Sequence, residues 1–179
     1  FVRRKRACII WVSKGLTHPL SSELTKLEKP NTRVFNEVLE EHPLDSSEWR
    51  IRPYLESKDS ESHNNHKYCK VNGSESVINV LGANYGKGQP DSPLVVHPED
   101  SSRTRLVTTS EHTNIRDING EYKQAIVQFA QGSHKITKGT LSKKTAAHKA
   151  LGNSGGPKCW ANVGEWIGDW LSYHSIHAL

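Results

Sequence analysis

A serine set between glycines is the feature of this sequence that most directly suggests chemistry. It lies in the string GNSGGP, which covers residues 152–157. A serine acts as an acyl-transfer nucleophile when its hydroxyl is exposed and backbone N–H groups converge on the developing oxyanion. Glycines on either side let the backbone turn tightly enough to aim those groups. The string therefore predicts a nucleophile loop, with Ser154 as the nucleophile and the backbone of Gly152 and Asn153 as the oxyanion hole.

This string resembles the nucleophile loop of chymotrypsin-like serine proteases, in the form with Asn before Ser that the HtrA-like and glutamyl-endopeptidase-like branches carry. Residues 163–168, VGEWIG, look like the strand that follows the loop in that family. The resemblance implies a serine endopeptidase that hydrolyses polypeptides through an acyl-enzyme and needs no cofactor. It also implies His66 as general base and Asp91 as its orienting carboxylate, at intervals before Ser154 similar to those of compact viral members. The implied fold is mostly β, with two barrels.

The residues after the serine also fit a helix. Pro157 suits a first helical turn, and the apolar residues after it are spaced as one face of a helix. These apolar residues are Trp160, Val163, Ile167, Trp170 and Leu171. In this interpretation Gly152 ends one helix and Ser154 lies in a plain turn between two helices.

A cluster of lysines surrounds the segment 141–151. The lysines are Lys135, Lys138, Lys143, Lys144 and Lys149. The segment resembles the start of the C-terminal helix of double-stranded RNA-binding domains, in which lysines at a helix N-terminus contact phosphates. The resemblance implies an alternative function, a non-enzymatic basic module that binds double-stranded RNA or another polyanion. A net charge of +5 and a pI near 9.1 permit such a partner without requiring it. The other interpretation is a basic surface helix.

A pattern of histidines and a cysteine raises the question of a metal. His63, His66 and Cys69 are spaced so that imidazole and thiolate groups could hold three corners of a tetrahedral zinc site. His97 or Cys159 could supply the fourth ligand. The chain has 10 histidines, so accidental triplets are common, and solvated loop histidines are the default interpretation.

Length and composition limit the architecture. A chain of 179 residues predicts one domain over residues 1–179, with residues 1–6 as a basic tail. We expect no membrane span, because no apolar run approaches the roughly 20 residues that cross a bilayer. The sequence does not assign a cellular compartment.

Two Asn-Gly pairs are the strongest turn signals. Asn72-Gly73 and Asn119-Gly120 are each flanked by runs with strand-like composition. Because Asn-Gly suits the positive φ angles of a tight hairpin turn, the sequence predicts two β-hairpins, one at each pair.

The spacing of apolar residues predicts further elements. It favours a short helix over 34–39, an edge strand over 49–55, a short strand at 94–96, and a helix over 141–151 that ends at Gly152 in a left-handed cap. Together these elements predict a single α+β domain with at least two β-hairpins and a C-terminal helix.

Overall fold

The computed structural model of this chain describes residues 34–53, 70–87, 92–132, 142–154 and 157–176. These residues belong to two compact units. One contains all described residues up to Ser154, and the other contains the long helix α5 (Pro157–Ile176). The α+β class and the C-terminal helix predicted from the sequence are confirmed, and the mostly β double barrel is wrong. Among the described residues, no helix has the length and apolar character needed to cross a membrane.

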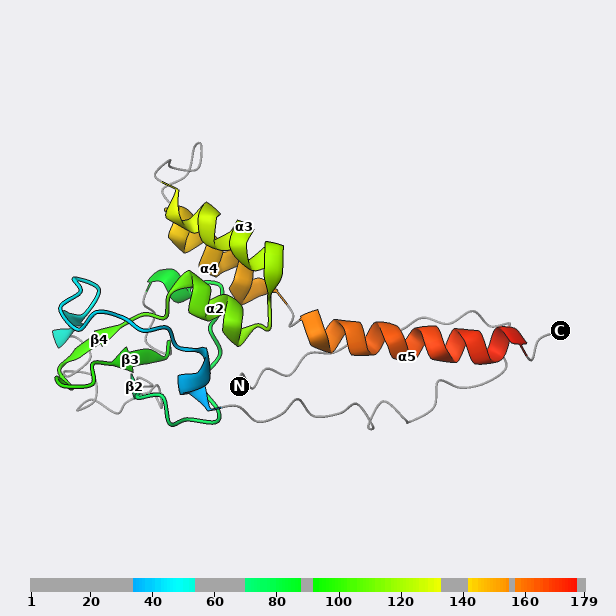
Figure 1. Cartoon of the computed structure of the whole chain (residues 1–179), viewed down its shortest axis with the longest axis horizontal. Helices are drawn as coiled ribbons and strands as arrows, with labels where there is room; N and C mark the ends of the chain where they lie inside the picture. Colours follow the sequence, from blue (N-terminus) through cyan, green and yellow to red (C-terminus); the bar gives the residue numbers. More distant parts are fainter. Residues whose placement is uncertain (1–33, 54–69, 88–91, 133–141, 155–156, 177–179) are drawn as a thin grey trace, which may run out of the picture. The chain divides into compact units, whose positions relative to one another are not determined.

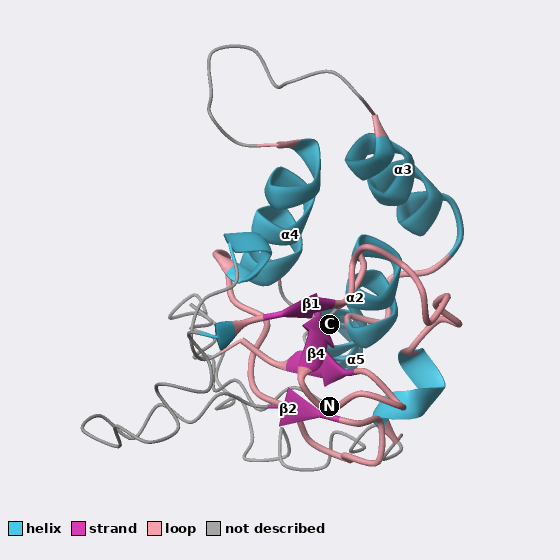
Figure 2. Cartoon of the chain, turned by 90° about the vertical axis from the view of Figure 1, so that its left-hand side faces the viewer, coloured by secondary structure: helices cyan, strands magenta, loops and turns pink. Residues whose placement is uncertain are grey.

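A small mixed sheet lies in the first unit (Figure 2). Its strands are β1 (Arg50–Ile51), β2 (Lys70–Val71), β3 (Leu94–Val96) and β4 (Arg103–Arg105), in the order β1-β4-β3-β2. The strands β3 and β4 form an antiparallel hairpin, β1 pairs with β4 antiparallel, and β2 pairs with β3 parallel. The predicted strand at 94–96 is therefore confirmed, and the predicted edge strand is β1.

The first unit also contains helices. They are η2 (Phe35–Val38), η3 (Tyr85–Lys87), α2 (Thr109–Ile115), α3 (Gly120–Gln131) and α4 (Lys143–Asn153). The helices α2, α3 and α4 lie together and contact one another (Figure 1), and α4 also contacts η3. The helix α2 begins with a capping box, in which Thr108 and Glu111 satisfy each other's backbone N–H groups.

The apolar core joins η2, the sheet and α2. Its buried members are Phe35, Val38, Trp49, Val71, Ile78, Leu81, Tyr85, Val95, Val107 and Ile115. The hydroxyl of Tyr85 donates to the Pro93 carbonyl at 2.9 Å and accepts from the Val107 N–H at 2.7 Å. The buried phenol is therefore hydrogen-bonded on both sides, as burial of a polar group requires.

Among the described residues, neither Asn-Gly pair forms a β-hairpin. After β2, Gly73 turns the chain with φ at 102°, and its carbonyl accepts the N–H of Asn36 from η2 at 2.8 Å. The turn thus binds η2, and β2 pairs with β3. At the second pair, Asn119 is the N-cap of α3 and Gly120 begins the helix with φ at 60°. Tyr122, Ile126 and Phe129 come next with the spacing of a helix, which outweighs the turn signal.

The helix α4 confirms the prediction over 141–151 but continues past Gly152. This glycine lies inside the helix, where a Cβ atom would clash with the carbonyl carbon and oxygen of Gly82. The predicted left-handed cap is wrong, because the glycine allows the helix to approach the backbone at Gly82.

A buried ion pair joins β4 to α2. Arg105, which is 2% exposed, donates from both terminal nitrogens to the fully buried carboxylate of Glu111, each at 2.7 Å. The carboxylate also accepts the Thr108 N–H at 2.6 Å and the Glu40 N–H at 3.0 Å. A buried ion pair is tolerated only where such additional hydrogen bonds offset the loss of hydration.

We expect Glu111→Gln to lower the free energy of unfolding by about 3–5 kcal/mol, because it leaves the guanidinium buried without its counter-charge. Urea unfolding followed by circular dichroism measures the change. Arg103→Met is the matched control, since it removes the exposed Arg103–Asp100 ion pair and should leave stability nearly unchanged. Equal losses in the two variants would contradict the prediction.

Two buried histidines connect α2 to α4. The Nδ1 atoms of His112 and His148 lie 3.0 Å apart, and both side chains are fully buried against Tyr85. One Nδ1 must donate and the other accept, so this contact requires the accepting ring to be neutral. Burial lowers the pKa of His112 to about 2, with the charges of His148 and Arg116 adding to the effect. Burial and the charge of Lys144 lower the pKa of His148 to about 4, and Glu48 opposes this in part.

These lowered pKa values predict an acid-sensitive fold. Below the unfolded-state pKa of about 6.5, the unfolded chain binds protons that the folded chain does not, so stability falls as the pH falls. We expect a loss of up to about 1.4 kcal/mol per pH unit for each imidazole between pH 6.5 and 5. Urea unfolding across this range measures the slope, and His148→Gln should reduce it by about half. A free energy of unfolding that stays constant from pH 7 to 5 would refute the prediction.

Candidate functional site: a groove beside Trp49

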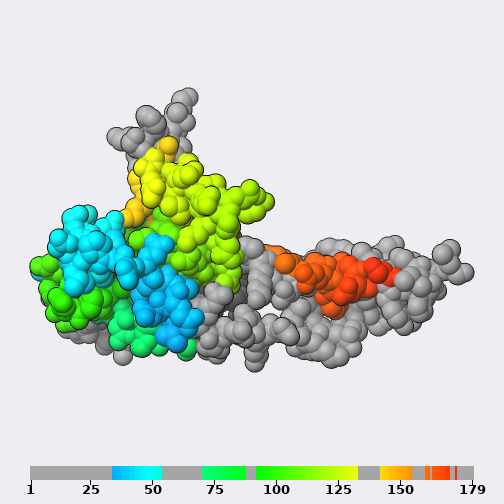
Figure 3. Space-filling model, in the orientation of Figure 1, coloured from blue at the N-terminus to red at the C-terminus, as the bar shows by residue number. Residues whose placement is uncertain are grey.

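A groove of about 550 Å³ opens between the segment after η2 and the β3–β4 hairpin. Figure 3 shows the segments 34–53 and 92–105 side by side on one face of the first unit. The residues that line the groove are Asn36, Leu39, Glu40, His42, Leu44, Trp49, Asn72, Val95, Val96, His97, Pro98, Glu99, Ser101 and Arg105. A groove of this volume is in the size range of small-ligand sites.

Trp49 lines the groove, and its mostly buried side chain is held on several sides. Its indole N–H donates to the Pro43 carbonyl at 2.9 Å. The rings of His97 and His42 meet it edge-on, with centroids 4.9 and 5.9 Å away. The guanidinium of Arg105 lies 5.1 Å from the ring centroid, a cation–π contact. The indole is therefore a fixed, flat wall.

His97 links the two sides of the groove, the β3–β4 loop and the segment before Trp49, through hydrogen bonds. Its Nδ1 accepts the backbone N–H groups of Glu99 and Asp100, both at 3.1 Å. Its Nε2 lies 3.0 Å from the Leu44 carbonyl. A carbonyl can only accept, so the hydrogen-bond pattern assigns the proton to Nε2 and makes the ring neutral. His97 is thus a positioning residue that ties the β3–β4 loop to the segment before Trp49.

The rim of the groove carries polar and acidic groups. Glu40 and Glu99 supply carboxylates, and Asn36, Asn72 and Ser101 supply neutral polar groups. The Glu40 carboxylate also accepts the hydroxyls of Thr108 and Ser110 and lies 3.8 Å from the Lys123 Nζ atom. Among the described residues of the lining, the one permanent cation is Arg105, whose charge is balanced by Glu111. The groove therefore suits a planar group that is uncharged or positively charged and that donates hydrogen bonds. A phosphate does not suit it.

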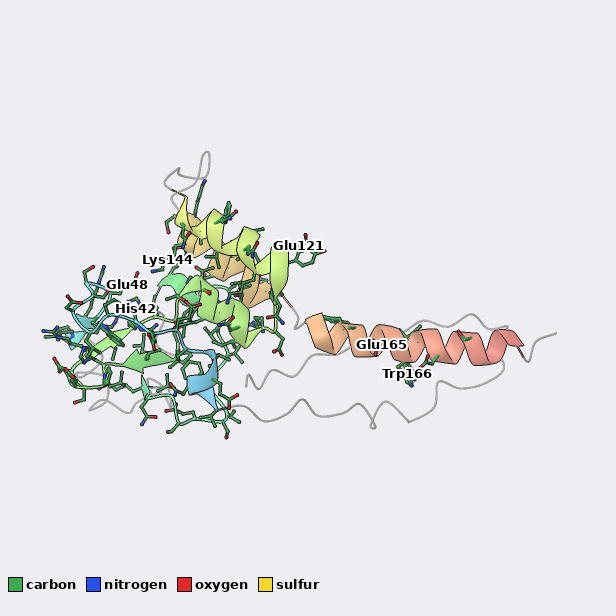
Figure 4. All side chains as sticks on the ribbon, in the orientation of Figure 1. His42, Glu48, Glu121, Lys144, Glu165 and Trp166 are labelled. Carbon is green, nitrogen blue, oxygen red and sulfur yellow. The ribbon has the colours of Figure 1, made fainter. Side chains whose placement is uncertain are left out.

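A salt bridge beside the groove fixes the start of α4. The Nζ atom of Lys144 donates to the Glu48 carboxylate at 2.8 Å, and Figure 4 shows both residues near His42. Burial tends to raise the pKa of Glu48, but the hydrogen bond and positive charge of Lys144 lower it below its usual value. The pair stays ionised at neutral pH and holds α4 against the segment that carries Trp49.

The predicted nucleophile loop is the end of a helix. Ser154 is the C-cap of α4, and its hydroxyl donates to the Leu151 carbonyl at 2.8 Å. Asn153 is the last residue of α4, and Gly152 lies inside it, so neither belongs to a turned loop that could form an oxyanion hole. His66 and Asp91, the predicted base and its orienter, lie outside the described residues.

The segment after the serine is helical. Residues 163–168 belong to α5, where the resemblance to chymotrypsin-like proteases requires a strand. The helical interpretation of the apolar spacing is the one that the structure confirms. The protease interpretation therefore loses both its loop and its following strand.

The lysines of α4 are largely engaged within the chain. Lys143 lies over the Phe129 ring at 5.6 Å, and Lys144 binds Glu48, while Lys149 is exposed. Lys135 and Lys138 lie outside the described residues. The three described lysines thus do not form the row of free lysines that the RNA-binding interpretation required.

The predicted zinc ligands His63, His66 and Cys69 also lie outside the described residues. Both ring nitrogens of His97, a candidate for the fourth ligand, form hydrogen bonds with backbone groups. Within the described ranges, no group of three or more His, Cys, Asp or Glu side chains is placed to hold a metal ion.

Sequence reasoning did not single out Trp49, Arg105 and Glu111. The pattern Thr-x-x-Glu at residues 108–111 was a readable signal, because it is typical of a capping box at a helix start. This pattern could have predicted where α2 begins and that Glu111 lies in its first turn. Nothing local could have shown that the same carboxylate binds Arg105 in the interior.

No protein-family model and no curated protein matches the sequence. Among the solved structures that match is the crystal structure of the S. pombe Dnmt2 methyltransferase, with 13% sequence identity and a TM-score of 0.55. The match covers 83% of this chain and 45% of that chain, so this chain spans less than half of that protein. At this identity the match shows the fold alone. It overturns the resemblance to chymotrypsin-like proteases and the serine endopeptidase function, and it gives no support to a double-stranded RNA-binding module.

Proposed function

We propose that this chain is part of a methyltransferase and that it binds the methyl acceptor. The observation that carries the proposal is the fold match to the S. pombe Dnmt2 methyltransferase, which extends over 83% of this chain. The groove beside Trp49 adds a place where an acceptor group can be held.

The described residues do not fit the usual methyl donor, S-adenosylmethionine. In open α/β sheets, such ligands bind at the carboxyl ends of parallel strands, in turns that lead into helices. Among the described strands, β2 and β3 alone are parallel, over two paired positions, and β3 leads directly into the hairpin with β4. The part of the chain that the structure describes therefore suits the acceptor better than the donor.

A nucleic acid is the acceptor that the charges favour. The chain has a net charge of +5, and the exposed arginines Arg50 and Arg103 lie on the adjacent strands β1 and β4. Their register places them on opposite faces of the sheet, and Arg103 also pairs with Asp100. Phosphates suit these arginines, and an uncharged planar base suits the groove with its flat Trp49 wall. In this arrangement the phosphates position the strand and the groove receives the base.

Photo-crosslinking tests the proposal. The purified chain is irradiated with single-stranded or duplex nucleic acid, with a basic polypeptide, and with S-adenosylmethionine labelled in its methyl group. We expect nucleic acid to crosslink within residues 39–53 or 95–105, and S-adenosylmethionine not to crosslink to described residues. Arg103→Ala should weaken nucleic-acid binding several-fold at low salt, because it removes a phosphate contact. Lys149→Ala, which removes an exposed cation on α4, is the matched control and should change little.

Each other outcome overturns a stated part of the proposal. Donor crosslinking without any acceptor would make this the donor-binding part. Crosslinking of the polypeptide alone would show that the acceptor class is wrong. If none of the three molecules crosslinks, the role in methyl transfer is wrong.

A further inference from the structure

The turn after β2 holds an asparagine in an unusual chemical setting. Asn72 is exposed and is followed by Gly73, whose φ angle is 102°. The backbone nitrogen that follows an asparagine can attack the side-chain amide carbon and close a five-membered succinimide ring. A following glycine favours this reaction because it has no Cβ atom to obstruct the approach.

A carboxylate lies at the nitrogen that would attack. The Glu75 carboxylate accepts the Gly73 N–H at 2.9 Å through one oxygen and the Asn72 N–H at 2.9 Å through the other. A base at hydrogen-bond distance from the proton to be removed is the geometry of general-base catalysis. Glu75 is therefore placed to accept the proton of the Gly73 amide.

Two donors lie at the oxygen that would become negative. The backbone N–H of Ser74 donates to the Asn72 Oδ1 at 3.0 Å, and the Ser74 hydroxyl donates to the same oxygen at 2.7 Å. Paired donors of this kind stabilise the oxyanion of a tetrahedral intermediate. The turn thus combines a nucleophile, a base and an oxyanion site around one amide group.

We propose that Asn72 is a self-catalysed deamidation site. The Gly73 nitrogen gives its proton to Glu75 and forms a bond to the Asn72 Cγ atom, while negative charge develops on Oδ1 beside Ser74. The Cγ–Nδ2 bond then breaks, and the leaving nitrogen takes the proton from Glu75 and departs as ammonia. Water adds to one of the two ring carbonyls of the succinimide and opens it to aspartate or isoaspartate. No oxidation or reduction occurs.

The product would change the groove beside Trp49. Asn72 lines this groove, whose rim already carries the carboxylates of Glu40 and Glu99. Deamidation adds a third negative charge there. An isoaspartate also lengthens the backbone in a turn whose Gly73 carbonyl accepts the Asn36 N–H at 2.8 Å. The modification therefore acts on both the charge and the shape of the groove.

The second Asn-Gly pair provides an internal control. Asn119 is the N-cap of α3 and makes no side-chain capping hydrogen bond. Within the described residues, no carboxylate binds the Gly120 N–H and no donor binds the Asn119 side chain. The same chain thus contains the reactive dipeptide with and without the catalytic groups.

Peptide mapping by mass spectrometry measures both rates in the folded chain at neutral pH. We expect Asn72 to deamidate at least about tenfold faster than Asn119, as general-base and oxyanion assistance would give. In concentrated urea the two rates should become nearly equal. The rate at Asn119 should rise in proportion to hydroxide concentration, and the rate at Asn72 should depend less on pH because Glu75 supplies the base.

Two variants assign the roles. Glu75→Gln keeps a hydrogen-bond acceptor in the turn but removes the base, and Ser74→Ala removes one oxyanion donor. Both should slow deamidation at Asn72 without changing the rate at Asn119, and circular dichroism verifies that the variants fold. The proposal is overturned if folded Asn72 reacts no faster than Asn119, a comparison that needs no variant. It is also overturned if Glu75→Gln speeds the reaction, since the carboxylate would then be restraining the turn.

Discussion

The groove and its surroundings depend on the buried ion pair between Arg105 and Glu111. The side chain of Arg105 extends from β4, and its guanidinium contacts the face of Trp49 and donates two hydrogen bonds to the Glu111 carboxylate. The carboxylate in turn receives the N–H of Thr108 at the start of α2 and the N–H of Glu40. Removing either charge would leave its partner in a low-dielectric interior, where an unpaired ion is costly. One ion pair therefore fixes the strand, the helix and the wall of the groove together.

The same ion pair sets the electrostatic character of the groove. Because Glu111 neutralises Arg105, the other acidic groups among the described lining residues are Glu40, which lies 3.8 Å from the Lys123 Nζ atom, and Glu99. His97 adds no charge, since its hydrogen bonds require the neutral ring. A site built in this way suits an uncharged or positively charged planar group better than a phosphate. It would also be sensitive to a new carboxylate at residue 72.

The sequence predicted those elements whose determinants are local. The helix over 141–151 follows from its spacing, and the strand at 94–96 follows from an apolar run between turn residues. The hairpins at the Asn-Gly pairs were wrong because that signal reports positive φ angles and does not determine which element comes after the turn. At Gly73 the turn is bound by η2, and at Gly120 it starts a helix. The candidate site could not be predicted, because Trp49, His97 and Arg105 come together only through tertiary contacts.

The glycine-rich string at 152–157 shows that the sequence also did not determine the chemistry of this segment. A glycine indicates that another group approaches the backbone closely, and an oxyanion is one such group. In this fold the group near Gly152 is the backbone at Gly82, with which a Cβ atom would clash. Ser154 then caps the helix by donating to the Leu151 carbonyl. A packing contact between a helix and a loop thus requires the same small residues as a nucleophile loop. The fold, which matches part of a methyltransferase, decides between the two.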